Sequence, residues 1–214
     1  VYECKSCTER FNASFVAQLG HSFVNGVCSV CGAKNPFVDI DAKGRHIYFT
    51  DAILWAAEKG ITTGTSETTF EPDGTCTRAQ VVTFLWRLAG QPEPKGQASA
   101  FTDVRNDQYY SRAVAWAAEK GITTGTSETT FEPGATVTRA QFVTFLWRYL
   151  DRPVSGGFGV FADVSSSHFA CSAILWAYEN GITSGTSATT FEPEGAATRA
   201  QVVTFLYRAD NSEK

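Results

Sequence analysis

Apolar residues recur at helical spacing in a segment that occurs three times along the chain. In its first copy, one face of the predicted helix carries four apolar residues at positions i, i+3, i+4 and i+7: Val81, Phe84, Leu85 and Leu88. Val82 and Trp86 widen that face. We therefore expect a helix that is buried between two neighbours, beginning after a threonine in each copy: Thr77, Thr138 and Thr198.

A second, shorter helix is predicted before it. The segment DAILWAAEKG at 51–60 is compact and apolar, with Thr50 as the predicted N-cap and Gly60 as the C-terminal stop. Ser111 and Gly121 take these places in the second copy, and Ser172 (or Cys171) and Gly181 in the third. A loop of about fifteen residues, rich in Gly, Thr and Ser, joins the two helices; loops of that length are functional or tightly packed on themselves.

The recurrence is an internal repeat. WAAEKGITTGTSETTFEP stands at 55–72 and again, letter for letter, at 116–133, and returns as WAYENGITSGTSATTFEP at 176–193. We predict four segments, which are 1–36, 37–96, 97–156 and 157–214. A lone unit of two short helices cannot cover its apolar faces, so the repeats must pack together. Periodicity alone allows a linear stack or closure around a threefold axis, and both are mainly α.

Composition removes some classes of function. The chain has 214 residues and a formal net charge of −4, with no basic patch or stripe of the kind that nucleic-acid binding requires. The apolar runs are too short and interrupted for a transmembrane helix. The chain begins at Val1 and contains no methionine, so we expect a processed or excised piece of a longer protein.

The repeated motifs resemble the S-layer homology domain family. Each copy has, in order, an opening Phe-x-Asp, a helix, Gly-Ile, a glycine-containing loop, Phe-x-Pro and Thr-Arg-Ala-Gln, together covering about 37–208. The family commonly has Glu where this chain has Gln80, Gln141 and Gln201. The resemblance implies a pseudo-threefold, three-pronged module with ligand grooves between adjacent repeats. It also implies an extracellular bacterial protein that binds cell-wall polysaccharide non-covalently, often through ketal-linked pyruvate.

The arginine of Thr-Arg-Ala-Gln needs an explanation of its own. Threonine and glutamine fit a capping box, whereas a cation at the first helical position opposes the helix dipole. One hypothesis is a salt bridge to Asp39, Asp103 and Asp163 or to Glu71, Glu132 and Glu192. The other joins the arginine to the free amides of its helix start as an anion site for a sugar carboxylate. In that case, replacing the arginine would cost little stability.

The predicted ligand-binding set follows from the second hypothesis and from the resemblance. Glycines in the loop would let a ligand approach closely, and tryptophans in the first helix would form sugar platforms or, alternatively, core. An aromatic also precedes that helix, at Phe49, Tyr110 and Phe169. The set comprises Arg78, Arg139, Arg199, Gln80, Gln141, Gln201, Asp39, Asp103, Asp163, Gly64, Gly125, Gly185, Trp55, Trp116 and Trp176.

Four cysteines crowd the first segment with the spacing of a zinc ribbon. Two Cys-x-x-Cys pairs place four thiolates for tetrahedral Zn²⁺, and the site would be structural because no coordination position stays open: Cys4, Cys7, Cys28 and Cys31. Two disulfides are the alternative, and His21 could replace one ligand. The remaining cysteines, Cys76 and Cys171, are expected to be small buried side chains, and a bridge between them stays open.

No catalytic constellation recurs in the repeats. The three histidines occupy no equivalent positions, and no Gly-x-Ser-x-Gly motif is present. We therefore expect a binding module and not an enzyme. The leading hypothesis is a cell-wall anchor, and the alternative is a protein-interaction or self-assembly module of a surface layer.

Overall fold

The computed structural model describes residues 2–3, 10–11, 23–24, 27–28, 34–40, 47–96, 101–157 and 159–212. This part of the chain contains two helices in each repeat: α1 (Ile47–Glu58), α2 (Arg78–Leu88), α3 (Ser111–Glu119), α4 (Arg139–Tyr149), α5 (Cys171–Glu179) and α6 (Arg199–Ser212). None of these described helices is long and apolar enough to cross a membrane.

The first segment contributes two antiparallel pairs of very short strands. β1 (Tyr2–Glu3) pairs with β2 (Arg10–Phe11), and β3 (Phe23–Val24) pairs with β4 (Val27–Cys28). Cys28 thus ends a hairpin strand. The other three residues of the predicted zinc site lie outside the described residues: Cys4, Cys7 and Cys31.

The second helix of each repeat begins where the capping box predicts. The Thr77 side chain accepts from the Gln80 backbone N–H at 3.3 Å, and the Thr77 N–H donates to the Gln80 side chain at 2.9 Å. The same pair of bonds starts α4 and α6. The apolar face predicted for α2 is buried, with Val81 and Leu85 fully covered.

The first helices end as predicted and begin differently. After α1, the N–H of Ile61 donates to the Ala56 carbonyl and that of Gly60 to the Ala57 carbonyl, while Gly60 has a φ of 68°. This Schellman motif needs the left-handed conformation that glycine adopts freely. The predicted N-caps are wrong. Thr50 is buried inside α1, and α3 and α5 start without a side-chain cap bond because backbone turns lead into them.

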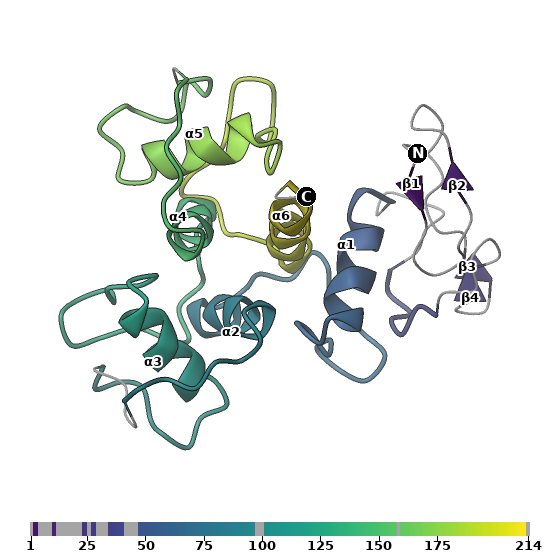
Figure 1. The fold of residues 1–214 in the computed structure, drawn as a ribbon, viewed down its shortest axis with the longest axis horizontal. Coiled ribbons are helices and arrows are strands. Elements are labelled where there is room, and N and C mark those ends of the chain that lie inside the picture. The colour runs from purple at the N-terminus through teal and green to yellow at the C-terminus, as the bar shows by residue number, and fades with distance from the viewer. Residues whose placement is uncertain are drawn as a thin grey trace.

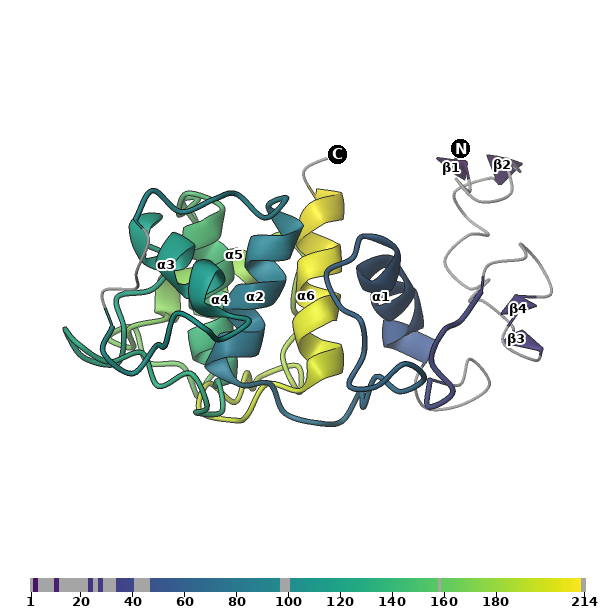
Figure 2. The same ribbon diagram turned by 90° about the horizontal axis from the view of Figure 1, so that it is seen from below.

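Each first helix packs on the second helix of the preceding repeat. The packed pairs are α2 with α3, α4 with α5, and α6 with α1. The second helices run side by side through the middle of the molecule, and the first helices lie outside them (Figures 1 and 2). Because α6 of the third repeat returns to α1 of the first, the stack is closed, which confirms the three-pronged, pseudo-threefold arrangement.

A ring of backbone hydrogen bonds closes the repeats at the centre. The N–H of Cys76 donates to the Ala197 carbonyl, that of Ala197 to Val137, and that of Val137 back to Cys76, each at 3.0 Å. Cys76 is fully buried, and burial raises the pKa of its thiol to about 12. Cys76 and Cys171 are both free, so no bridge joins them.

Candidate functional site

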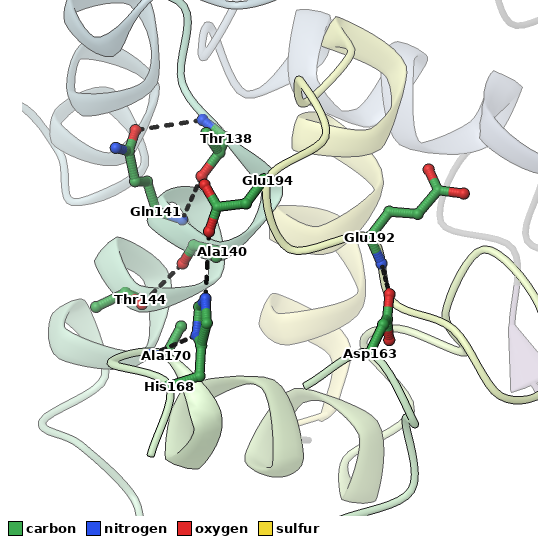
Figure 3. Close-up of polar contacts among 9 residues, drawn as sticks. All are labelled: Thr138, Ala140, Gln141, Thr144, Asp163, His168, Ala170, Glu192 and Glu194. Carbon is green, nitrogen blue, oxygen red and sulfur yellow. Dashed lines mark hydrogen bonds and ion pairs between the residues drawn. The ribbon is translucent and has the colours of Figure 1, made fainter. Parts of the chain in front are cut away.

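The backbone N–H groups at the start of α2, α4 and α6 donate hydrogen bonds to carbonyls of the following repeat. The N–H of Arg78 donates to the Ala135 carbonyl at 2.9 Å, and that of Ala79 to the Pro133 carbonyl at 3.1 Å. The third repeat closes the cycle, since the Arg199 N–H donates to Gly74 at 2.8 Å. The capping box uses the remaining N–H groups (Figure 3 shows it for Thr138). The predicted anion site built on free helix amides is therefore wrong.

The arginine side chain also reaches into the following repeat. Arg78 is 4% exposed, its Nε donates to the Phe131 carbonyl at 2.8 Å, and its Cζ lies 4.7 Å from the centre of the Phe131 ring. Such a stack over an aromatic face attracts a cation. Arg139 stacks in the same way on Phe191, and Arg199 on Phe70. The guanidinium thus joins two repeats as a donor and as a packed plane.

The aspartates that could pair with these arginines are used elsewhere. Asp163 accepts from the N–H groups of Phe191 at 2.9 Å and Glu192 at 2.7 Å, the second of which is drawn in Figure 3. Burial raises the pKa of Asp163, but these backbone hydrogen bonds outweigh it and hold the pKa below its usual value. Asp39 and Asp103 make equivalent bonds. Among the described residues, no ion pair joins the three arginines to a carboxylate.

One donor of each arginine is left without a partner. Nη2 is buried and unpaired, within the described part of the chain, in Arg78, Arg139 and Arg199. Burial lowers the pKa of Arg78, while Glu132 and Asp103 of the next repeat raise it. Arginine keeps its charge under such shifts, because its ordinary pKa is above 12. A buried cation with an unused donor requires an acceptor, which can be water or a ligand.

Arg139 lines a groove of about 310 Å³ between repeats. Helix α6 supplies Thr204, Phe205 and Arg208, and the glycine-containing loop supplies residues 183–186. Tyr48, at the start of α1, completes the wall and is 61% exposed. Burial raises the pKa of the Tyr48 hydroxyl, and Arg208 and Arg139 lie close enough to lower it in part. The groove therefore combines two cations, several hydroxyls and an accessible aromatic ring.

The other repeats place an aromatic at the same position. Tyr109 is 61% exposed and Phe169 63% exposed. Burial raises the pKa of Tyr109, and Arg87 and Arg199 lower it only in part, as Arg208 and Arg139 do for Tyr48. Tyr48 and Tyr109 were not predicted from the sequence. The aromatics predicted in these two repeats were their neighbours, Phe49 and Tyr110. Only burial separates the two members, since Phe49 is 1% exposed.

The predicted ligand-binding residues divide into groove and core. Gln201 and Gly185 line the groove with Arg139. Trp116 and Trp176 are buried, and half-buried Trp55 packs edge-on against Tyr207, so the structure gives these tryptophans the packing role. The aspartates tie each opening Phe-x-Asp to its own Phe-Glu-Pro loop. The loop glycines are also structural, since a Cβ at Gly185 would lie 2.5 Å from the Phe161 ring.

The third repeat carries a histidine beside its exposed aromatic. His168 Nε2 lies 3.2 Å from Glu194 Oε1, and its Nδ1 accepts from the Ala170 N–H at 3.1 Å (Figure 3). The corresponding residues are Ile47, the first residue of α1, in the first repeat and Gln108, before α3, in the second. The repeats therefore share the arginine and the aromatic but differ in the charges around them.

Comparison with known proteins gives one family and several longer relatives. The family model described as S-layer homology domain matches residues 37–82, 100–143 and 160–203. An "S-layer protein" of Bacillus thuringiensis subsp. finitimus is 28% identical over 95% of this chain and 25% of its own length. A "Surface-layer 125 kDa protein" of Lysinibacillus sphaericus is 30% identical over 88% of this chain and 16% of its own. A "Cellulosome-anchoring protein" of Acetivibrio thermocellus is 25% identical over 65% of this chain and 33% of its own.

The chain thus spans a third or less of each of these relatives. The three matched segments together cover more than half of the chain, and each contains one Phe-x-Asp opening and one Thr-Arg-Ala-Gln helix start. The chain belongs to the S-layer homology domain family.

Proposed function

We propose that this chain anchors a bacterial protein to the cell surface by binding an acidic cell-wall polysaccharide in the grooves between its repeats. One observation carries the proposal. Each arginine of the three helix starts keeps a buried Nη2 donor with no partner among the described residues, and Arg139 lines an open groove. A planar guanidinium with a free donor fits a carboxylate oxygen, such as that of a ketal-linked pyruvate.

The remaining groove surface suits a sugar. The side chain of Tyr48 is 61% exposed, and Ser184 and Thr186 line the same groove. Polar groups that fix orientation around an apolar contact are typical of small-ligand sites. Because the arginine is buried behind the groove surface, an acidic group must enter deeply to reach it. The proposal therefore favours an acidic substituent over a neutral sugar ring.

The names of the relatives support a surface location. They include surface-layer proteins, an anchoring protein and a glycoside hydrolase named exoglucanase XynX, which is 28% identical over 73% of this chain and 15% of its own length. A segment shared by such different proteins supports attachment and not catalysis as its role. Any catalytic activity would then belong to other parts of a longer protein.

The test is calorimetry with purified wall polymer, before and after chemical removal of its pyruvate. A triple variant, Tyr48→Ala with Tyr109→Ala and Phe169→Ala, removes the exposed aromatic ring of each repeat. We expect it to lower affinity at least tenfold, and depyruvylation of the polymer to do the same to the unaltered protein. Val154→Ala, at a residue that is 97% exposed, is the control. A folded triple variant with unchanged affinity would contradict the proposal.

Self-assembly is the competing function, and the same purified protein and polymer can distinguish it from wall binding. A module that binds copies of itself should change mass with concentration in light scattering, without polymer. A wall anchor should stay at constant mass until the polymer is added.

We further propose one structural zinc ion held by four thiolates, on the basis of their spacing. Cys28 lies at the end of β4, in a hairpin with β3. Elemental analysis should return one zinc per chain, and chelation should release four reactive thiols from the first segment. The absence of zinc, together with two disulfides in peptide mapping, would contradict this proposal. The proposed ligands are Cys4, Cys7, Cys28 and Cys31.

A further inference from the structure

A second cavity lies at the C-terminal ends of α3 and α4. Its volume is about 320 Å³, at the lower end of the range of small-ligand sites. Arg148 occupies the same repeat position as Arg208, which lines the groove at Tyr48. The other residues of this cavity occupy repeat positions that do not line that groove. Its walls are formed by Ala89, Pro92, Trp116, Lys120, Ile122, Arg148, Tyr149 and Asp151.

Trp116 contributes a donor that has no partner. The side chain is 3% exposed, and its Nε1 is buried without a hydrogen bond within the described residues. The indoles of the second helices are satisfied, since Trp86 Nε1 in α2 donates to the Pro92 carbonyl at 2.8 Å and Trp147 Nε1 in α4 to the Pro153 carbonyl at 2.9 Å. Buried polar groups in native proteins are nearly always paired, so an acceptor is expected beside Trp116, a residue of the cavity wall.

Positive charge gathers at the same cavity. Lys120 and Arg148 line it, and Arg148 Nη1 is held by the Ile122 carbonyl at 3.2 Å. Burial lowers the pKa of Arg148, and nearby Arg152 lowers it further. Among the described residues of the cavity wall, only Asp151 is acidic. An acceptor that carries negative charge would relieve the repulsion among these cations.

The combination of Trp116, Lys120 and Tyr149 occurs only in the second repeat. Repeat alignment places Leu88 and Ala209 where Tyr149 stands, and Asn180 where Lys120 stands. Trp116 packs against Tyr149 with 6.0 Å between ring centres, whereas Trp55 packs against Tyr207 across repeats. Threefold architecture alone therefore does not account for the cavity.

We propose that this cavity binds a small oxyanion, a carboxylate or phosphate group. One oxygen accepts from the Trp116 indole N–H, and Lys120 and Arg148 balance the charge. The site is separate from the groove that contains Tyr48 and does not depend on the function proposed for it. The same chemistry could come from a free anion or from an acidic group on a polymer, so both are tested.

The experiment follows indole N–H resonances by two-dimensional NMR on the full chain, which has five tryptophans. Trp116→Phe assigns the relevant resonance by its loss and keeps the ring packing. Titration with sodium acetate and with inorganic phosphate, at constant ionic strength, should move the Trp116 resonance saturably. Wall polymer fragments with and without their acidic groups form the second arm. Movement with small anions identifies a free ligand, and movement with acidic fragments alone identifies a polymer group.

Matched lysine variants separate binding from general salt effects. Lys120→Gln should weaken the response by roughly tenfold in apparent affinity, because it removes one charge beside the ligand. Lys59→Gln, at the equivalent position of the first repeat, should leave the response unchanged. A Trp116 resonance that moves with none of the anions, or equally in both lysine variants, would overturn the proposal and leave water as the acceptor.

Discussion

A cation at the N-terminus of its own helix interacts unfavourably with the helix dipole, which costs roughly some tenths of a kcal/mol of stability. Arg78 offsets this with contacts to a different repeat, because its guanidinium stacks on Phe131 and donates to the Phe131 carbonyl. Cation–π stacking and a hydrogen bond from a charged donor each contribute about 1–2 kcal/mol at buried sites. At the scale of the residue, the arginine therefore stabilises the interface between repeats, while its Nη2 has no hydrogen-bond partner among the described residues.

Arg78→Ala should lower the free energy of unfolding by about 2–3 kcal/mol, because stacking and the carbonyl bond are both lost. This reverses the expectation from sequence that such a change costs little. Urea denaturation gives the measurement. Arg105→Ala, which removes an exposed arginine paired with exposed Asp107, is the control and should cost less than about 0.5 kcal/mol. Equal effects of the two changes would contradict the interlocking role.

Asp163 should make stability depend on pH in the acid range. Its pKa is lowered in the folded state, so its stabilisation is present above the unfolded value and is lost as pH falls through the folded pKa. Asp163→Asn should therefore be destabilising at pH 7, but by less than about 1 kcal/mol, because solvent screens this exposed carboxylate. The difference from the unaltered protein should shrink in unfolding experiments below pH 4. A difference that stays constant with pH would show that the charge is unimportant, and exposed Glu128→Gln serves as the control.

At the scale of the element, glycines mark turns that differ in how much space surrounds them. Gly121 ends α3 with a φ of 66°, and the nearest atom to a Cβ there would be 3.8 Å away on Arg152. Gly125, in the following loop, has a φ of 83°, and a Cβ would lie 2.6 Å from the Phe101 ring. Both need the left-handed conformation, but only the second also lacks room for a side chain.

Gly121→Ala should therefore cost about 1 kcal/mol, and Gly125→Ala more than about 3 kcal/mol, because steric overlap adds to conformational strain. Thermal and urea unfolding of the two variants give the comparison, and each is the control for the other. If the two costs were equal, the packing of the loop against its opening phenylalanine would not matter for stability.

At the scale of the whole molecule, the repeats form a closed cycle. The first helix of each repeat packs on the second helix of the preceding one, and α6 completes the cycle on α1. The hydrogen bond from Arg199 Nε to the Phe70 carbonyl joins residues 129 positions apart. No repeat within this cycle covers its own apolar faces, so stability should be shared by all three.

A fragment of residues 37–156, which lacks the third repeat, should fail to show a cooperative unfolding transition. The reason is that α1 loses the helix that covers it. Circular dichroism in urea and size-exclusion chromatography test this against residues 37–214, which should unfold in one transition. Cooperative, monomeric unfolding of the shorter fragment would show that the cycle is dispensable.

Much of this fold could be predicted from local sequence. The capping boxes at Thr77 and Thr138 and the stop at Gly60 involve groups within a few residues of one another, so residue types alone specify them. The start of α1 was predicted wrongly, because Thr50 is buried inside a helix that already begins at Ile47. Of the candidate groove, the sequence indicated Arg139, Gln201 and Gly185.

The sequence by itself therefore determined the repeat, the helices and the family, because these depend on periodicity and on short-range hydrogen bonds. Tertiary structure alone decided that the helix-start amides bind the next repeat, which leaves the arginine's Nη2 as the unused donor. It also decided that Tyr48 faces the groove while Phe49 and Trp176 are core. Those outcomes depend on contacts between residues far apart in the chain, whose burial is set only when three repeats close into one cycle.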